Sequence, residues 1–161
     1  MQDHLTKDFL AEKHESLLFM LIGLAAIVAS IFLFKNNSAY KGMAYPLIAI
    51  ALIQLVVGGS VYFRTDGQIK NLAAQLKTAP AAYKTNELVR MQTVNNNFKI
   101  YKIIEIVLLL AGIAMTFMFR QNQLFYAMAI GLIMQASLML GLDLFAEKRA
   151  AEYVKHIEQL V

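Results

Sequence analysis

The chain has 161 residues, of which 58% are hydrophobic and 16% are charged, and its formal net charge is +4. That charged fraction is far below the roughly 25% of soluble domains, so a water-soluble globular class is excluded and one compact membrane domain over residues 1–161 is expected. The basic residues lie beside apolar stretches, without zinc-finger spacing or basic–aromatic interleaving, which excludes nucleic acid as a partner. The absence of cysteine excludes disulfides, thiolate metal sites and cysteine nucleophiles.

Four apolar stretches follow one another along the chain, each close to the 17–25 residues that a helix needs to cross a hydrocarbon core about 30 Å thick. Acidic residues precede the first stretch, which is long for a cleavable signal, so we expect it to be retained as a span. The sequence therefore predicts an all-α integral membrane protein with four transmembrane helices in a lipid bilayer. The stretches are Leu17–Phe34, Met43–Phe63, Ile103–Phe119 and Leu124–Leu142.

A polar, amphipathic segment adjoins each apolar stretch on the same predicted side of the membrane. Apolar residues recur there at helical spacing, so each segment is expected to extend its span by three or four turns. The extensions either close a small bundle or lie flat in the membrane interface. We expect Thr65-Asp66-Gly67 to break the second helix, and Pro80 or Thr85 to lie near the start of the third. The extensions cover residues 3–16, 66–78, 84–100 and 147–160.

The distribution of Lys and Arg orients these helices. Twelve of the 15 basic residues would lie on one side and three on the other, which by the positive-inside rule places both termini and the middle segment 64–102 in the cytoplasm. A plasma or inner membrane is the expected location. The three residues of the outer side are Lys35, Lys41 and Arg120.

The two halves of the chain resemble each other weakly. An offset of 85 positions places Phe34-Lys35 on Phe119-Arg120, and an offset of 81 places Gln54 on Gln135. Both halves would begin and end inside, so the pattern predicts two hairpins related as a parallel repeat. In lipid, the buried amides of Gln54 and Gln135 are expected to bond across to another helix. The repeat halves are about 1–79 and 80–161.

Polar residues at the inner ends of the spans form the main candidate site. Charged side chains within or beside a span are costly and point to function by default. We expect Lys102 to pair with Glu105, and Arg64 to pair with Asp143. The alternatives are a ring of ion pairs that fixes helix register and a site for an ion, a proton or a small ligand. This candidate polar belt consists of Glu15, Tyr62, Arg64, Tyr101, Glu105 and Asp143.

A metal site is a weaker hypothesis. Glu152 and His156 lie four residues apart on one helical face, a spacing that can bind zinc, and His14 could add a ligand if the first and fourth helices are neighbours. The paired Glu-x-x-His signature of di-iron bundles and the HExxH motif are absent from the sequence. No cofactor is therefore expected.

The segment Glu87–Asn95, with Arg90 and Asn95, faintly resembles the Arg- and Asn-bearing motif of the membrane-associated glutathione and eicosanoid enzymes, which are also small four-span proteins. The motif precedes the third span here, whereas that family carries it on the second. We therefore do not assign the activity from so short a resemblance. No Ser-His-Asp grouping, phosphate-binding glycine loop or nucleophile motif occurs elsewhere.

The sequence favours a small non-enzymatic membrane protein, a scaffold, accessory or regulatory subunit. Its cytoplasmic extensions would meet a second copy of the chain, a membrane partner or a cytoplasmic partner. The alternative is a small transporter or channel that moves an ion, a proton or a small molecule through the polar belt. A small membrane enzyme is the third hypothesis.

Overall fold

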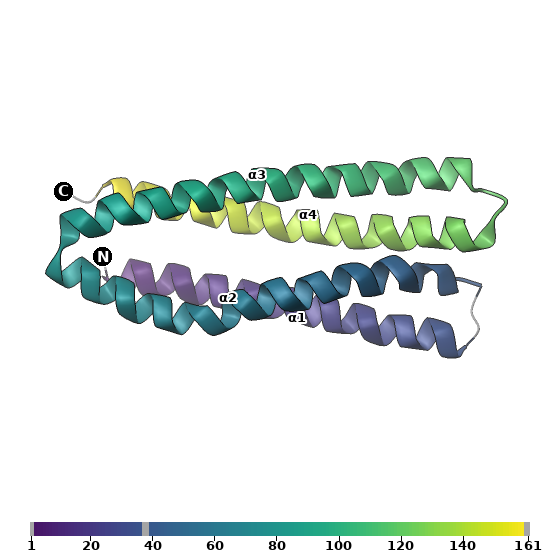
Figure 1. Ribbon diagram of the computed structural model, residues 1–161, viewed down its shortest axis with the longest axis horizontal. Helices are drawn as coiled ribbons and strands as arrows, with labels where there is room; N and C mark the ends of the chain where they lie inside the picture. The colour runs from purple at the N-terminus through teal and green to yellow at the C-terminus, as the bar shows by residue number, and fades with distance from the viewer. Residues whose placement is uncertain (1, 37–38, 160–161) are drawn as a thin grey trace.

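The chain folds into four long antiparallel helices, as the computed structural model shows for residues 2–36 and 39–159, with side chains described from residue 5 onward (Figure 1). All four helices are long and apolar enough to cross a membrane, which confirms the helices expected from the sequence. A short 3-10 turn, η1 (Lys41–Met43), precedes the second helix. The helices are α1 (Gln2–Lys35), α2 (Ala44–Thr78), α3 (Pro80–Met118) and α4 (Gln123–Glu158).

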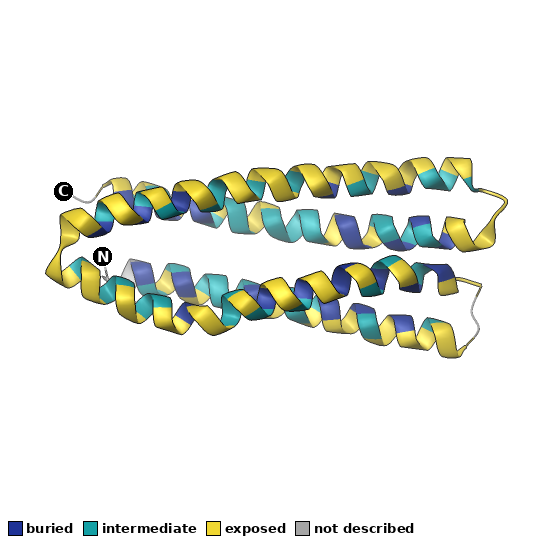
Figure 2. Cartoon of the chain, in the orientation of Figure 1, coloured by how far each residue is buried: buried dark blue, intermediate teal, exposed yellow. Residues whose placement is uncertain are grey.

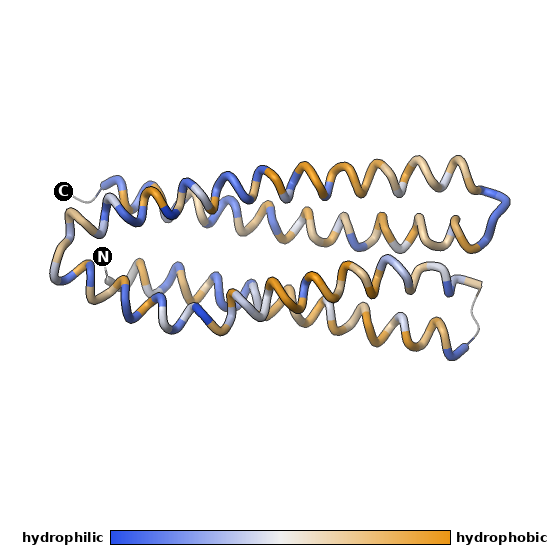
Figure 3. Tube along the Cα trace, in the orientation of Figure 1, coloured by the Kyte–Doolittle hydropathy of each residue, from blue (hydrophilic) through white to orange (hydrophobic). Residues whose placement is uncertain are grey.

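Each helix is longer than a membrane requires. The 39 residues of α3 extend about 58 Å at 1.5 Å per residue, roughly twice the thickness of a hydrocarbon core. The trace shows the same division, with apolar residues concentrated at the end that holds the α1–α2 and α3–α4 turns and more hydrophilic residues at the other end (Figure 3). Within the most apolar window of each helix, at most 28% of the residues are buried.

The helices pair as two hairpins, since α1 packs mainly against α2 and α3 mainly against α4 (Figure 1). Both ends of the chain and the α2–α3 junction lie at one end of the bundle, which we call the inner end. The other two turns lie at the opposite, outer end. At that end the hairpins meet where α4 packs against η1 and the start of α2.

Glycine permits the close approach at the outer end. A Cβ atom on Gly131 would lie 2.8 Å from the carbonyl oxygen and 2.9 Å from the Cα of Met43. Gly42 likewise lies against the backbone of Leu124 and the Cβ of Ala127. Because the obstructing atoms are mostly backbone, a side chain at Gly131 would force the two hairpins apart.

The junctions between helices follow recognisable local signals. Pro80 occupies the first turn of α3, as the sequence predicts, since proline lacks the amide hydrogen that this position leaves unpaired. Asn122 caps α4, because its side-chain oxygen accepts hydrogen bonds from the backbone amides of Leu124 and Phe125 at 3.2 and 3.3 Å.

The expected break at Thr65-Asp66-Gly67 is wrong, because α2 continues without interruption to Thr78. The Thr65 hydroxyl donates to the carbonyl oxygen of Val61 within the helix at 2.7 Å. The Asp66 carboxylate accepts from the Lys13 ammonium of α1 at 2.7 Å, so the polar residues of the turn signal are satisfied without a turn.

The extensions stand upright and share one hydrophobic core at the inner end, which we call the extension bundle. Residues from α1, α3 and α4 form its buried centre, and Ile69, Leu72 and Leu76 of α2 pack against it. Buried positions line the inside of the bundle along both hairpins (Figure 2). Of the two alternatives left open by the sequence, the structure therefore has the bundle. The buried residues are Leu5, Phe9, Tyr83, Met91, Ala150, Tyr153 and Ile157.

Candidate functional site

A buried carboxylate lies at the centre of the extension bundle. Glu87 of α3 is only 1% exposed, and its two oxygens accept hydrogen bonds from the Arg90 guanidinium at 2.7 and 2.8 Å. The Tyr153 hydroxyl of α4 also donates to Glu87 Oε1, at 2.8 Å. This bidentate pair and the third donor compensate for the cost of removing the charge from water.

Tyrosine and phenylalanine rings extend this network across three helices. The hydroxyl oxygens of Tyr83 and Tyr153 lie 2.9 Å apart, and since Tyr153 gives its hydrogen to Glu87, Tyr83 is the donor between them. Phe9 of α1 contacts Tyr153 edge-on at 5.8 Å, and the Arg90 guanidinium lies over the Phe9 ring at 5.3 Å. The cluster of Glu87, Arg90, Tyr83, Tyr153 and Phe9, hereafter the Glu87 cluster, joins the two hairpins.

The environment of the Glu87 cluster keeps its phenols neutral. Burial, together with the nearby Glu87 carboxylate, raises the pKa of Tyr153 far above its ordinary value of 10.0. Burial also raises the pKa of Tyr83. Both hydroxyls therefore remain protonated donors throughout the physiological range, which suits a structural role in the hydrogen-bond network around Glu87.

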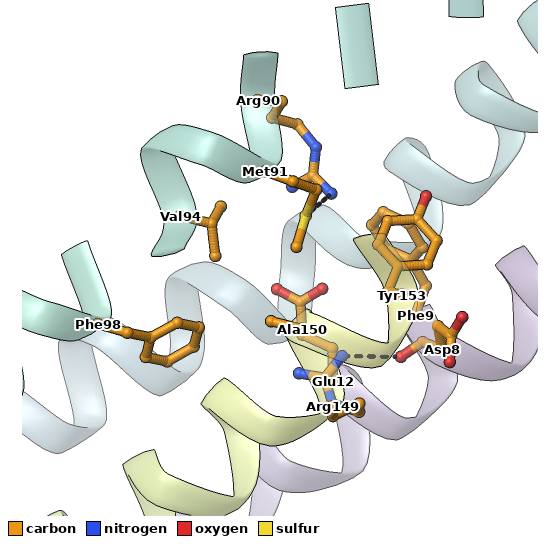
Figure 4. A pocket seen from close by; sticks show the side chains of 10 residues that line it. All are labelled: Asp8, Phe9, Glu12, Arg90, Met91, Val94, Phe98, Arg149, Ala150 and Tyr153. Atoms are coloured by element: carbon orange, nitrogen blue, oxygen red, sulfur yellow. Dashed lines mark hydrogen bonds between the residues drawn. The ribbon is translucent and has the colours of Figure 1, made fainter. Parts of the chain in front are cut away.

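A small cavity of about 30 Å³ lies beside the Glu87 cluster, between α1, α3 and α4 (Figure 4). A space of that size has room for a water molecule or two and for no larger solute. Arg149 at its edge donates to the backbone oxygen of Asp8 at 3.2 Å. The lining residues are Asp8, Phe9, Glu12, Arg90, Met91, Val94, Phe98, Arg149, Ala150 and Tyr153.

On the α1 side, the predicted belt separates into pairs. Glu15 forms an ion pair with Arg149 of α4 at 2.9 Å, which links the hairpins. Arg64 lies 3.7 Å from Glu12, and the expected pairing of Arg64 with Asp143 is therefore wrong. Since α1 and α2 are antiparallel neighbours in one hairpin, Glu12 of α1 lies at the same level of the bundle as Arg64 of α2.

The aromatic members of the belt do not contribute to a shared site. Tyr62 lies beneath the Lys13 ammonium, which is 4.8 Å from its ring centroid, and the ring also contacts Phe63 edge-on. Tyr101 is 47% exposed on the outside of α3. Neither ring faces the Glu105 and Asp143 carboxyl groups in any contact that the structure records.

On the other hairpin, Lys102 pairs with Glu147 of α4, so the expected Lys102–Glu105 pair is wrong. Glu105 instead lies at the same level as Asp143 of α4, because the Lys102–Glu147 pair one turn away sets α3 and α4 in that register. Both residues were proposed as belt members, and they are the two that the structure brings together.

The structure lends no support to the metal hypothesis. Among residues 5–36 and 39–159, no three His, Asp or Glu side chains are grouped closely enough to hold a metal ion. His14 and Glu152 are exposed, and His156 is partly buried. Glu152 and His156 therefore lie on one face of α4, but within those residues no third ligand is grouped with them.

The sequence contains a signal for the Glu87 cluster that the belt argument did not use. Tyr83, Glu87 and Met91 recur every four residues, so Glu87 falls on the apolar face of its helix and Arg90 follows at i+3.

Searches against protein-family models, curated proteins and solved structures find no match to this chain.

Proposed function

We propose that the chain is a four-span membrane protein that acts as a non-enzymatic scaffold, accessory or regulatory subunit through its extension bundle. The observation that carries the proposal is the shared core of all four extensions beyond the apolar spans. Four packed helices closed by the Glu87 cluster form a rigid platform, and they present a mainly polar surface at the basic end of the molecule.

Exposed apolar side chains support insertion in a bilayer. Val56 of α2 and Phe117 and Met118 of α3 are more than 70% exposed, and they lie in the apolar stretches of two different helices. Such surfaces in water would promote aggregation, whereas lipid covers them without cost. The Lys and Arg asymmetry supports an inner end in the cytoplasm, with both termini there.

The orientation has a direct test, because the chain has no native cysteine. Single substitutions at exposed positions, Gln121→Cys in the outer turn and Ala82→Cys near the α2–α3 junction, place one thiol at each end. In intact cells, a membrane-impermeant maleimide should label Gln121→Cys and should label Ala82→Cys only after lysis. Labelling of Ala82→Cys in intact cells would refute the proposed orientation.

The scaffold function is tested by site-specific crosslinking in cells. A photoreactive group at Asn71, exposed on the α2 extension, should give discrete adducts with a second copy or a partner. The same group at Gln121 is the matched control and should give few. A protein that stays monomeric in mild detergent and forms no adduct from Asn71 or from other exposed extension positions would refute the scaffold function.

A transporter is the second candidate, and the Glu105–Asp143 contact is the observation that favours it. The narrow cavity of the extension bundle weighs against a solute path at the inner end, because only water fits there. In proteoliposomes, ion- or pH-dependent flux that Asp143→Asn abolishes, in a variant that still folds, would promote this candidate over the scaffold.

A further inference from the structure

Glu105 is buried without any donor to satisfy it. Its side chain lies on α3 and is 1% exposed, and neither carboxyl oxygen accepts a hydrogen bond from the part of the chain that the structure describes. A buried carboxylate in that position would lack compensation for several kcal/mol of lost hydration. These surroundings therefore disfavour Glu105 as an isolated carboxylate anion.

Asp143 of α4 lies at the same level as Glu105, because Lys102 and Glu147, one turn away on each helix, pair across the α3–α4 interface. The two carboxyl groups interact with each other, and Glu147, one turn further along α4, adds a second like charge close to Asp143. The basic side chains nearest in sequence and depth are engaged elsewhere: Lys102 pairs with Glu147, and Arg64 of α2 pairs with Glu12. Glu105 is buried and Asp143 is partly buried, so two carboxylates at this level repel each other unless a cation lies between them.

A proton fits this site better than a metal ion. Metal cations take four or more ligands, and no three acidic or histidine side chains are grouped here within the described residues. A proton needs only two oxygens. We propose that Glu105 and Asp143 form a proton-binding site, in which one carboxyl group donates a hydrogen bond to the other and the pair carries a single negative charge.

The position of the site gives the proton a structural consequence. The pair lies at the inner boundary of the apolar stretches, where α3 and α4 pack directly against each other. Release of the proton places two negative charges between these helices, with Glu147 adjacent, so the α3–α4 interface loosens when the site empties. This inference is independent of the scaffold function, because it rests only on the α3–α4 hairpin.

Infrared spectroscopy of the full-length protein in lipid nanodiscs tests the proposal, because a protonated carboxylic acid has its own carbonyl stretching band. At pH 7 the wild type should show the band of one protonated carboxyl group per chain. The double variant Glu105→Gln/Asp143→Asn keeps the shapes of both side chains and should lose the band. The matched control Glu152→Gln, an exposed carboxylate on the same helix, should retain it.

Sharing is tested by the single variants. In Glu105→Gln and in Asp143→Asn an amide donor replaces the like-charged partner, so the pH midpoint of the remaining band should fall by at least about one unit in each. An unchanged midpoint in either variant would assign the proton to one isolated carboxyl group and overturn the shared site.

Three further outcomes would also overturn it. The first is a wild type without the band at pH 7, and the second is a double variant that keeps it. The third is loss of the wild-type band when sodium chloride replaces choline chloride at equal ionic strength, which would make the site one for a metal cation. Circular dichroism of each variant confirms that the helices are intact, so a lost band reports on the proton.

Discussion

At the scale of single residues, burial of the Glu87 carboxylate carries a large desolvation cost for the extension bundle. The carboxylate is buried, but its Arg90 partner is 28% exposed, so this is an ion pair at the edge of a core. Removing one partner of such a pair leaves the other charge without compensation. Replacing both partners with apolar side chains removes the desolvation cost as well.

Glu87→Gln should therefore lower the free energy of unfolding by about 2 kcal/mol, less than the 3–5 of a fully buried pair because Arg90 is partly hydrated. The double variant Glu87→Met/Arg90→Met should be more stable than Glu87→Gln. Reversible unfolding in mixed detergent micelles measures both. The control is Arg64→Gln at a half-exposed pair, which should change little. A double variant that is less stable than the single would contradict this account.

Ionisation of the Tyr153 hydroxyl should destabilise the extension bundle at alkaline pH. Its folded pKa is raised above the unfolded value near 10.0, so the hydroxyl stabilises the fold fully below pH 10 and that stabilisation is lost as the pH rises further. Above pH 10 the free energy of unfolding should fall by up to about 1.4 kcal/mol per pH unit for this group. Unfolding measured from pH 8 to 12 should show a shallower decline in Tyr153→Phe. Equal slopes in the two proteins would refute the role of this hydroxyl.

At the scale of elements, the sequence predicts helices better than the contacts between them. The four long apolar helices, the amphipathic stripes of their extensions and the start of α3 at Pro80 follow from local periodicity and from the geometry of proline, whereas the sequence left open whether the extensions pack as a bundle. Gln54 and Gln135 were expected to bond across to another helix, and the structure confirms this with a 2.5 Å hydrogen bond between the two amides; their pairing with each other was not predicted.

The ion pairs were the weak point of the prediction. Depth and sequence spacing favoured Lys102 with Glu105 and Arg64 with Asp143, yet both cations pair with other acids. Rotation of each helix about its own axis decides such contacts, and spacing along one helix does not fix its rotation relative to the next. The Glu87 cluster was not predicted for a different reason. The spacing places Glu87 on the apolar face of its helix, but its partner Tyr153 lies 66 positions away and local spacing cannot identify it.

The two glycines of α4 provide a matched test of packing between elements. Gly131→Ala should destabilise the protein by about 1–3 kcal/mol, because the new methyl group meets the Met43 backbone across the hairpin interface. A Cβ at Gly141 has no neighbour within 4 Å, so Gly141→Ala should stabilise by up to about 1 kcal/mol through helix propensity. Thermal unfolding in mild detergent compares them. Destabilisation by both variants would mean that the helix, and not the interface, is sensitive.

At the scale of the whole molecule, the two hairpins are separable units held together at both ends. The Gly42 and Gly131 contacts join them at the outer end, and the Gln54–Gln135 bond adds to these within the spans. The Glu87 cluster and the Glu15–Arg149 pair join them at the inner end. Covalent continuity between the hairpins rests on Ala79 alone, the single residue between α2 and α3.

A cut at that junction should therefore be tolerated. Residues 1–79 and 80–161, expressed together as separate chains with a tag on one, should copurify from detergent, because the contacts at the two ends survive the cut. Gly131→Leu in the second chain should reduce the recovery of the first, since it pushes α4 away from the Met43 backbone. Gly141→Leu, at a position with open space, is the matched control and should leave recovery unchanged. Recovery of the tagged half alone from the unmutated pair would show that the connection through Ala79, and not the side-chain contacts, holds the hairpins together.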